Sequence, residues 1–291
     1  MIDPHPHSSE PTDAQITATI AVLGDDRGPL QETARRSLLR WGARAVPLLR
    51  EHADCARVQV RIRCRQLLRA IELRQLVGRF ARLQLDRSGR SSVPGLLEGA
   101  VLAAQIVRTF VPEARQLAAR LRREANALRR DCTGRSVPMC ARLLAERMHD
   151  RLGLARCDAE RLDAEHVLID RVLQNGVGAP VSLSLIYLLV ARWAGLSAAG
   201  VAMPDHFLVR LHGPRPLLLD PFHGGRVVTK VDCARYLRAN GHDRVREHLR
   251  DLSDCEVLIH YLRALRKTSA RRPTNDAQVT LGRALELLEP R

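Results

Sequence analysis

The chain has 291 residues, which is above the usual size of one domain and favours two domains or one domain with a helical extension. Apolar residues make up 45% of the chain and aromatic residues only 3%, so the core must be built mainly from Leu, Val and Ala. The formal net charge is +15, carried almost entirely by arginines spread along the chain. This charge leaves a basic, nucleic-acid-associated protein open as one alternative, although no nucleic-acid-binding motif accompanies it.

The cysteines and the chain start bear on the cellular compartment. The first ten residues are polar and do not resemble a targeting peptide. The longest apolar run, 181–191, is too short to span a bilayer. Seven cysteines lack both CxxC pairing and regular spacing: Cys55, Cys64, Cys132, Cys140, Cys157, Cys233 and Cys255. We therefore expect a cytoplasmic protein with reduced thiols and no membrane association.

Helices are predicted throughout the first half of the chain. After a disordered tail at 1–11, Thr12 and Gln15 have the spacing of a capping box and begin the first helix. Paired short amphipathic helices over 12–75 are typical of degenerate HEAT-type units. From 76 to 154 three further helices each open with Val-Pro, which places proline in the first turn.

The pattern changes after Gly178. The segment "GAPVSLSLIYLLVARWAGL" predicts a helix that is apolar nearly all round and therefore buried. "SAAGVAM", "HFLVRL" and "RPLLLDPF" predict three strands, the last two joined as a hairpin, and "GRVVTKVDCARYLRANG" predicts a short strand and a helix. Residues 244–291 return to helix. The expected fold class is α+β, with a helical N-terminal half, a buried central helix on a small antiparallel sheet, and a short helical tail.

Two ionisable residues mark the predicted hairpin. His206 opens one strand and Asp220 closes the next. A two-residue turn at Gly213-Pro214 would place them opposite each other with Cβ atoms about 5 Å apart, where the carboxylate orients the imidazole. The N-terminus of the buried helix, whose free N–H groups favour developing negative charge, is the natural place for a nucleophile.

These segments, in this order and spacing, resemble the SirB1-type branch of the transglutaminase-like superfamily, whose fold is related to papain. The resemblance is strongest over residues 140–240, and it places the domain at 76–243, with helices at 76–154 and helix plus sheet at 165–243. HEAT-like and TPR-like helical flanks also occur in bacterial members. In active members a cysteine at the start of the buried helix is the nucleophile, a histidine its base and an aspartate the orienting group.

The resemblance assigns the second and third of these roles to His206 and Asp220. Pro180 occupies the region of the expected cysteine, and no cysteine lies between Cys157 and Cys233. Ser182 is the better of two nearby hydroxyl candidates for a nucleophile. Further departures are Asp205, where the family usually has glycine, and Gly176, where it usually has a basic residue.

Two main functional hypotheses follow from these assignments. The first is a non-catalytic protein-binding or regulatory module, in which the cleft survives as a binding surface for a protein or peptide. The second is a serine-dependent acyl transferase or amide hydrolase that uses Ser182, His206 and Asp220. Under either hypothesis, no cofactor and no metal site is expected. His206, His212, His223 and Asp220 are close in sequence, but no HExxH motif or cysteine pair accompanies them, and His212 should lie at the far turn of the hairpin. The residues expected to line the cleft are Pro180, Ser184, Asp205, Phe207, Phe222 and His223.

Overall fold

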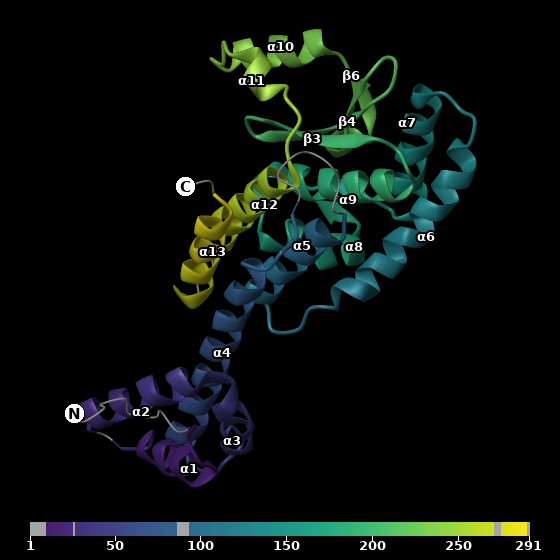
Figure 1. Ribbon diagram of the computed structural model, residues 1–291. Coiled ribbons are helices and arrows are strands. Elements are labelled where there is room, and N and C mark those ends of the chain that lie inside the picture. Colours follow the sequence, from purple (N-terminus) through teal and green to yellow (C-terminus); the bar gives the residue numbers. More distant parts are fainter. Residues whose placement is uncertain (1–9, 26, 86–92, 271–274, 290–291) are drawn as a thin grey trace, which may run out of the picture. The chain divides into compact units, whose positions relative to one another are not determined.

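The computed structural model describes residues 10–25, 27–85, 93–270 and 275–289. The chain forms two compact units, Met1–Leu76 and Val77–Arg291, and each is described by itself. Most of the disordered tail predicted at 1–11 lies outside the described residues. The α+β class is confirmed, because helices predominate and the second unit contains a small antiparallel sheet (Figure 1).

The first unit is entirely helical in its described part. Its elements are α1 (Asp13–Val22), α2 (Gly28–Trp41), the short turn η1 (Gly42–Ala45), α3 (Val46–His52) and most of α4 (Val58–Phe80). The predicted capping box begins α1, where Thr12 and Gln15 exchange side-chain and backbone hydrogen bonds. One face of each helix enters a common core that includes Ile16, Leu38 and Leu49. Amphipathic spacing therefore accounts for this unit.

The second unit holds all the strands of the described chain and the remaining helices. The larger helices are α5 (Val93–Val107), α6 (Ala114–Cys132), α7 (Val137–Glu146), α8 (Ile169–Asn175), α9 (Pro180–Trp193), α10 (Lys230–Ala239), α11 (Val245–His248), α12 (Asp254–Ser269) and α13 (Asn275–Leu288). The short turns are η2 (Arg147–Arg151), η3 (Ala159–Arg161), η4 (Ala164–His166) and η5 (Pro221–His223). The strands are β1 (Ala155–Arg156), β2 (Val177–Gly178), β3 (Ala198–Met203), β4 (His206–Leu211), β5 (Leu217–Asp220) and β6 (Arg226–Val228).

Helix α9 is the central helix that the sequence predicts. It begins with proline at its first position, where no N–H is needed, and the chain leaves it through Gly195 with φ at 88°. Every residue from Val181 to Ala191 is buried, because α9 packs against the sheet, α6 and α12 (Figure 1). The absence of a polar face in its sequence is thus explained by burial on all sides.

The four-stranded sheet has the antiparallel order β3-β4-β5-β6, and β1 and β2 form a separate parallel pair. Helix α9 packs on one face of the sheet. On the other face, Val201, Leu208 and Leu218 form a small core with Cys233 of α10 (Figure 1). The sheet is therefore covered on both faces at β4 and β5, which explains the apolar residues at the centre of these two strands.

Two local predictions are wrong. The β4–β5 connection is five residues long, 212–216, rather than a two-residue turn, because Leu211 pairs with Leu217. Pro216 has no N–H to add to the ladder. In the helical region, Pro112 does not lie in the first turn of α6, because that helix begins at Ala114 after Glu113 as N-cap. Among the described helices, none combines the length and hydrophobicity that a membrane span requires.

Candidate functional site

The register of the sheet brings His206 and Asp220 together diagonally. Val209 pairs with Leu219, so continuing the ladder places Asp220 opposite Leu208 rather than opposite His206 as predicted. Alternation along β4 still puts His206 on the same face as Leu208. A diagonal neighbour is within reach of a long side chain, and His206 Nε2 lies 3.0 Å from Asp220 Oδ1.

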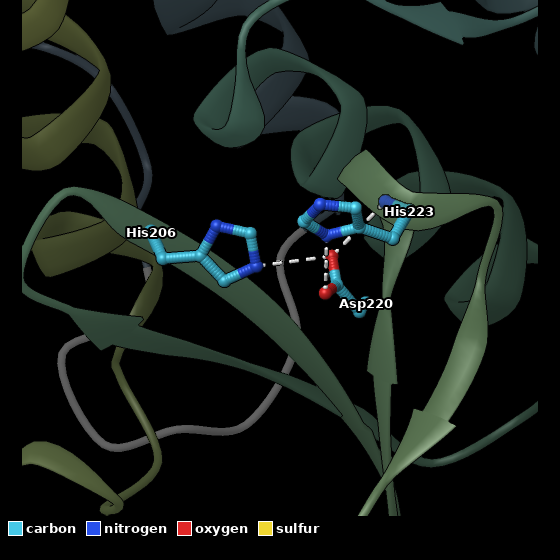
Figure 2. Close-up of side chains that lie close together, drawn as sticks. All are labelled: His206, Asp220 and His223. Atoms are coloured by element: carbon cyan, nitrogen blue, oxygen red, sulfur yellow. Dashed lines mark hydrogen bonds and ion pairs between the residues drawn. The ribbon is translucent and has the colours of Figure 1, made fainter. Parts of the chain in front are cut away.

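A second histidine shares this carboxylate. Asp220 caps the turn η5, and its Oδ1 accepts a hydrogen bond from the backbone N–H of His223 at 3.2 Å. The same turn folds the His223 ring back, so that its Nδ1 lies 2.7 Å from Asp220 Oδ2. Figure 2 shows that both rings approach the Asp220 carboxylate, and the two ring centroids lie only 5.6 Å apart. His223 was predicted to line the cleft, but its contact with Asp220 was not predicted; the spacing Asp-x-x-His was the available signal.

Burial and charge act in opposite directions on this carboxylate. The Asp220 side chain is only 4% exposed, and its burial raises the pKa of the carboxyl. Hydrogen bonds and positive charge from His206 and His223 lower it more, so the pKa lies below its ordinary value of 3.8. Asp220 is therefore ionised at neutral pH. Its two partners remain accessible, with 15% of the His206 side chain and 35% of the His223 side chain exposed.

Two buried polar atoms lie beside the turn that follows His223. The Tyr187 hydroxyl of α9 and Nε2 of His149 are both buried and make no hydrogen bond among the described residues. A Cβ at Gly225 would come within 2.8 Å of the Tyr187 hydroxyl oxygen, and one at Gly224 within 3.3 Å of His149 Nε2. Burial, with a smaller effect from Asp220, raises the pKa of Tyr187, which keeps the phenol protonated. Two buried polar groups without hydrogen-bond partners among the described residues thus lie beside the turn that follows Asp220.

The nucleophile region has a different character. Pro180, half-buried, is the first residue of α9. Ser182 is fully buried, and its hydroxyl donates a hydrogen bond to the carbonyl of Val167 at 2.7 Å. Ser184 is also fully buried and donates to the carbonyl of Phe207 at 2.8 Å. In the described structure, no hydrogen bond joins either serine to His206, so both hydroxyls are committed to backbone groups of neighbouring segments.

The cysteines do not replace the missing nucleophile. Cys157 lies beside the start of α9, because its N–H donates to the carbonyl of Gly178 at 3.1 Å, but its thiol is buried and burial raises its pKa. Cys233 belongs to the small core under the sheet, where burial and the carboxylates of Asp232 and Asp220 raise its pKa. Both are protonated thiols at neutral pH, the unreactive form.

The other residues predicted to line the cleft, Phe222, Asp205 and Phe207, lie in different environments. Phe222 packs edge-on against both His206 and His223, with ring centroids 6.0 and 5.3 Å apart. Asp205 is exposed at the tight turn before His206, with φ at 52°, a conformation that glycine adopts most readily. Phe207 does not line this side, because adjacent strand residues point to opposite faces; its ring is buried against His260.

Comparison with known proteins now identifies the family. Residues 109–265, more than half of the chain, match the model of the transglutaminase-like superfamily. The chain belongs to this superfamily. The matched region contains α9, the whole four-stranded sheet, and His206, Asp220 and His223. This confirms the resemblance seen in the sequence at the level of the superfamily.

Parts of the chain are similar in sequence to bacterial proteins named UPF0162. The protein of Xylella fastidiosa (strain 9a5c) is 37% identical over 103 residues, which cover 35% of this chain and 34% of that protein. The protein of Pseudomonas aeruginosa is 30% identical over 187 residues, covering 60% of this chain and 64% of that protein. The match thus spans about a third of the Xylella relative's length. No solved structure matches the chain.

Proposed function

We propose that this chain is a non-catalytic protein- or peptide-binding module that retains the cleft of a SirB1-type transglutaminase-like domain. The observation that carries the proposal is the start of α9. The resemblance places the nucleophile there, and this chain has Pro180, which offers no nucleophilic group. The nearest hydroxyl, that of Ser182, is buried and donates to the Val167 carbonyl.

The surface beside His206 and His223 supports a binding role. Phe222 presents an aromatic ring that is neither fully buried nor fully exposed, next to two partly exposed imidazoles. Apolar and aromatic side chains together with a few polar groups are typical of ligand-binding sites. In this proposal the HEAT-like helices of 12–75 and the TPR-like helices of 244–291 help to hold the partner.

Chemical labelling tests the absence of catalysis. The folded protein, Ser182→Ala and His206→Ala are treated with a fluorophosphonate and with iodoacetamide at neutral pH, and adducts are measured by intact mass. We expect no fluorophosphonate adduct on the wild type. As a positive control, Pro180→Cys should gain an alkylated thiol faster than Pro180→Cys combined with His206→Ala. A single fluorophosphonate adduct that disappears in both serine and histidine variants would instead establish the serine enzyme.

Selection of displayed peptides tests the binding role. Peptides are selected on the wild-type protein and then measured against Phe222→Ala and against Val227→Ala, which alters an exposed residue of β6 outside the histidine pair. We expect at least tenfold weaker binding to the Phe222 variant and unchanged binding to the Val227 variant. Peptides that bind all three proteins equally would show that this cleft is not the binding surface.

A further inference from the structure

The geometry points to a metal site at the cleft: we propose that His206, Asp220 and His223 bind one divalent transition-metal ion, such as Zn²⁺. The site goes beyond the proposed function, because metal binding does not depend on whether a peptide also binds. It differs from the sequence-based expectation of no metal site, for which His206, His212, His223 and Asp220 were considered together. His212 lies beyond the other end of β4 and pairs with Asp251 at 3.1 Å.

The donor set is the first argument. One nitrogen from each imidazole and one carboxylate oxygen all lie within 4.8 Å of one another. Two histidines and one carboxylate are a recurrent donor set for zinc and for non-haem iron. Bonds of about 2.0–2.2 Å to a tetrahedral ion place neighbouring donors ~3.4 Å apart. The present separations from the Asp220 oxygens are 3.0 Å for His206 and 2.7 Å for His223, so small ring movements would admit the ion.

The number of partners on the carboxylate is the second argument. Asp220 carries one negative charge, and two imidazoles converge on it within hydrogen-bonding distance. An ordinary orienting pair needs only one of them. The rings come from different elements: the turn η5 brings His223 to the carboxylate, and the pairing of β4 with β5 brings His206 there.

The surroundings supply the third argument. The backbone N–H of His223 holds Asp220 Oδ1, as second-shell donors do for ligating carboxylates. The fully buried Tyr187 side chain has a hydroxyl with no hydrogen-bond partner among the described residues, beside the turn that carries His223. Partial exposure of both imidazoles leaves a route for entry. Three protein ligands leave at least one coordination position for water or for an oxygen atom of a bound partner.

Metal titration of the chelator-treated full chain tests the site. Zn²⁺ binding is measured by calorimetry and by competition with a chromophoric chelator, and Co²⁺ is used as a spectroscopic probe of the ligands. We expect one equivalent bound, with at least a hundredfold loss of affinity in His223→Asn and in Asp220→Asn. His212→Asn, which breaks the other histidine–aspartate pair on this sheet, and His242→Asn, which breaks the packed pair His242–His248, should bind as the wild type does.

The outcomes are separable from peptide binding and from misfolding. Circular dichroism of each variant shows whether its fold is intact, and His206→Asn supplies an independent ligand variant. Absence of a stoichiometric ion on the folded wild type would overturn the proposal. So would affinity that survives in His206→Asn and His223→Asn, and so would a Co²⁺ spectrum showing thiolate ligation, which would place the ion on cysteines. None of these results depends on the labelling or peptide experiments above.

Discussion

Two buried carboxylates near α9, those of Asp254 and Asp220, are neutralised in different ways. Towards the C-terminal end of α9, Arg192 pairs with Asp254 at 2.5 Å, and the two side chains are only 4% and 1% exposed. Near the middle of the helix, Tyr187 approaches Gly225 in the turn after Asp220, and Asp220 is shared by two imidazoles that remain partly exposed. The Arg192–Asp254 pair is buried and its two charges balance. Asp220 has two imidazole partners, and both of them are partly exposed.

This difference distinguishes a carboxylate held in a buried ion pair from one whose partners a ligand can reach. A buried arginine that also donates to the Ala198 carbonyl joins α9, β3 and α12, and it has little freedom to meet a ligand. A carboxylate with two titratable, accessible partners is poised to exchange one of them. The comparison therefore supports a stabilising role for the C-terminal end of α9, and it agrees with the metal site proposed at Asp220.

Breaking the buried Arg192–Asp254 pair should have the largest effect on the free energy of unfolding. Arg192→Met leaves the Asp254 charge buried without its guanidinium, and breaking a buried pair in this way costs about 3–5 kcal/mol. Urea unfolding followed by Trp193 fluorescence, in a Trp41→Phe background, reports on the second unit. The matched control is Arg226→Met, since Arg226 is exposed and its Nε lies 3.8 Å from Asp220; it should cost less than about 1 kcal/mol. Equal losses in both variants would remove the distinction between the two sites.

Substitution of the two serines of α9 should have a smaller effect, which is a loss of stability. Ser182→Ala and Ser184→Ala each leave a buried carbonyl short of one donor, so each should lower the free energy of unfolding by about 1–3 kcal/mol. Ser197→Ala, at an exposed position, should change it by less than about 0.5 kcal/mol. Unchanged stability in the α9 variants would indicate that these hydroxyls are free for another role, contrary to the assignment made here.

Hydrophobic pattern predicted the framework of the site. An unbroken apolar helix, three apolar strands and a polar residue at the start or end of a strand were enough to predict α9, β3, β4 and β5 and to place His206 and Asp220 on one face. The family resemblance then indicated what that face does in related proteins. Burial of both sheet faces is a strong constraint, so this part of the fold is encoded locally.

Precise contacts could not be predicted in the same way. The register of β4 against β5 depends on the length of the 212–216 connection, which pairs Leu211 with Leu217. The direction of the Ser182 hydroxyl depends on Val167, which approaches from another segment. Glycine at position 176 has a backbone reason visible only in the structure: its φ is 76°, and a Cβ there would lie 2.5 Å from the Gly153 carbonyl oxygen.

The smallest predicted effect concerns pH at the C-terminal end of α9, two residues beyond Asp254. There Glu256 completes the capping box of α12 with Ser253 and pairs with Arg250. Its hydrogen bond to Arg250 is the main cause that lowers its pKa from 4.5 to about 2, with further lowering from Ser253 against an opposing effect of burial.

Because the folded-state pKa lies below the unfolded one, the carboxylate contributes stability above about pH 4.5 that is lost as the pH falls towards 2. Glu256→Gln removes this contribution, so the wild type should be more stable than the variant at pH 7, and the difference should narrow between pH 4.5 and 2. The Glu256 side chain is about one third exposed, which screens its charge and keeps the effect below that of the buried Arg192–Asp254 pair. Unfolding free energies of both proteins at pH 7, 4 and 3 measure it; a difference that stays constant over this range would show that the cap does not depend on the charge of Glu256.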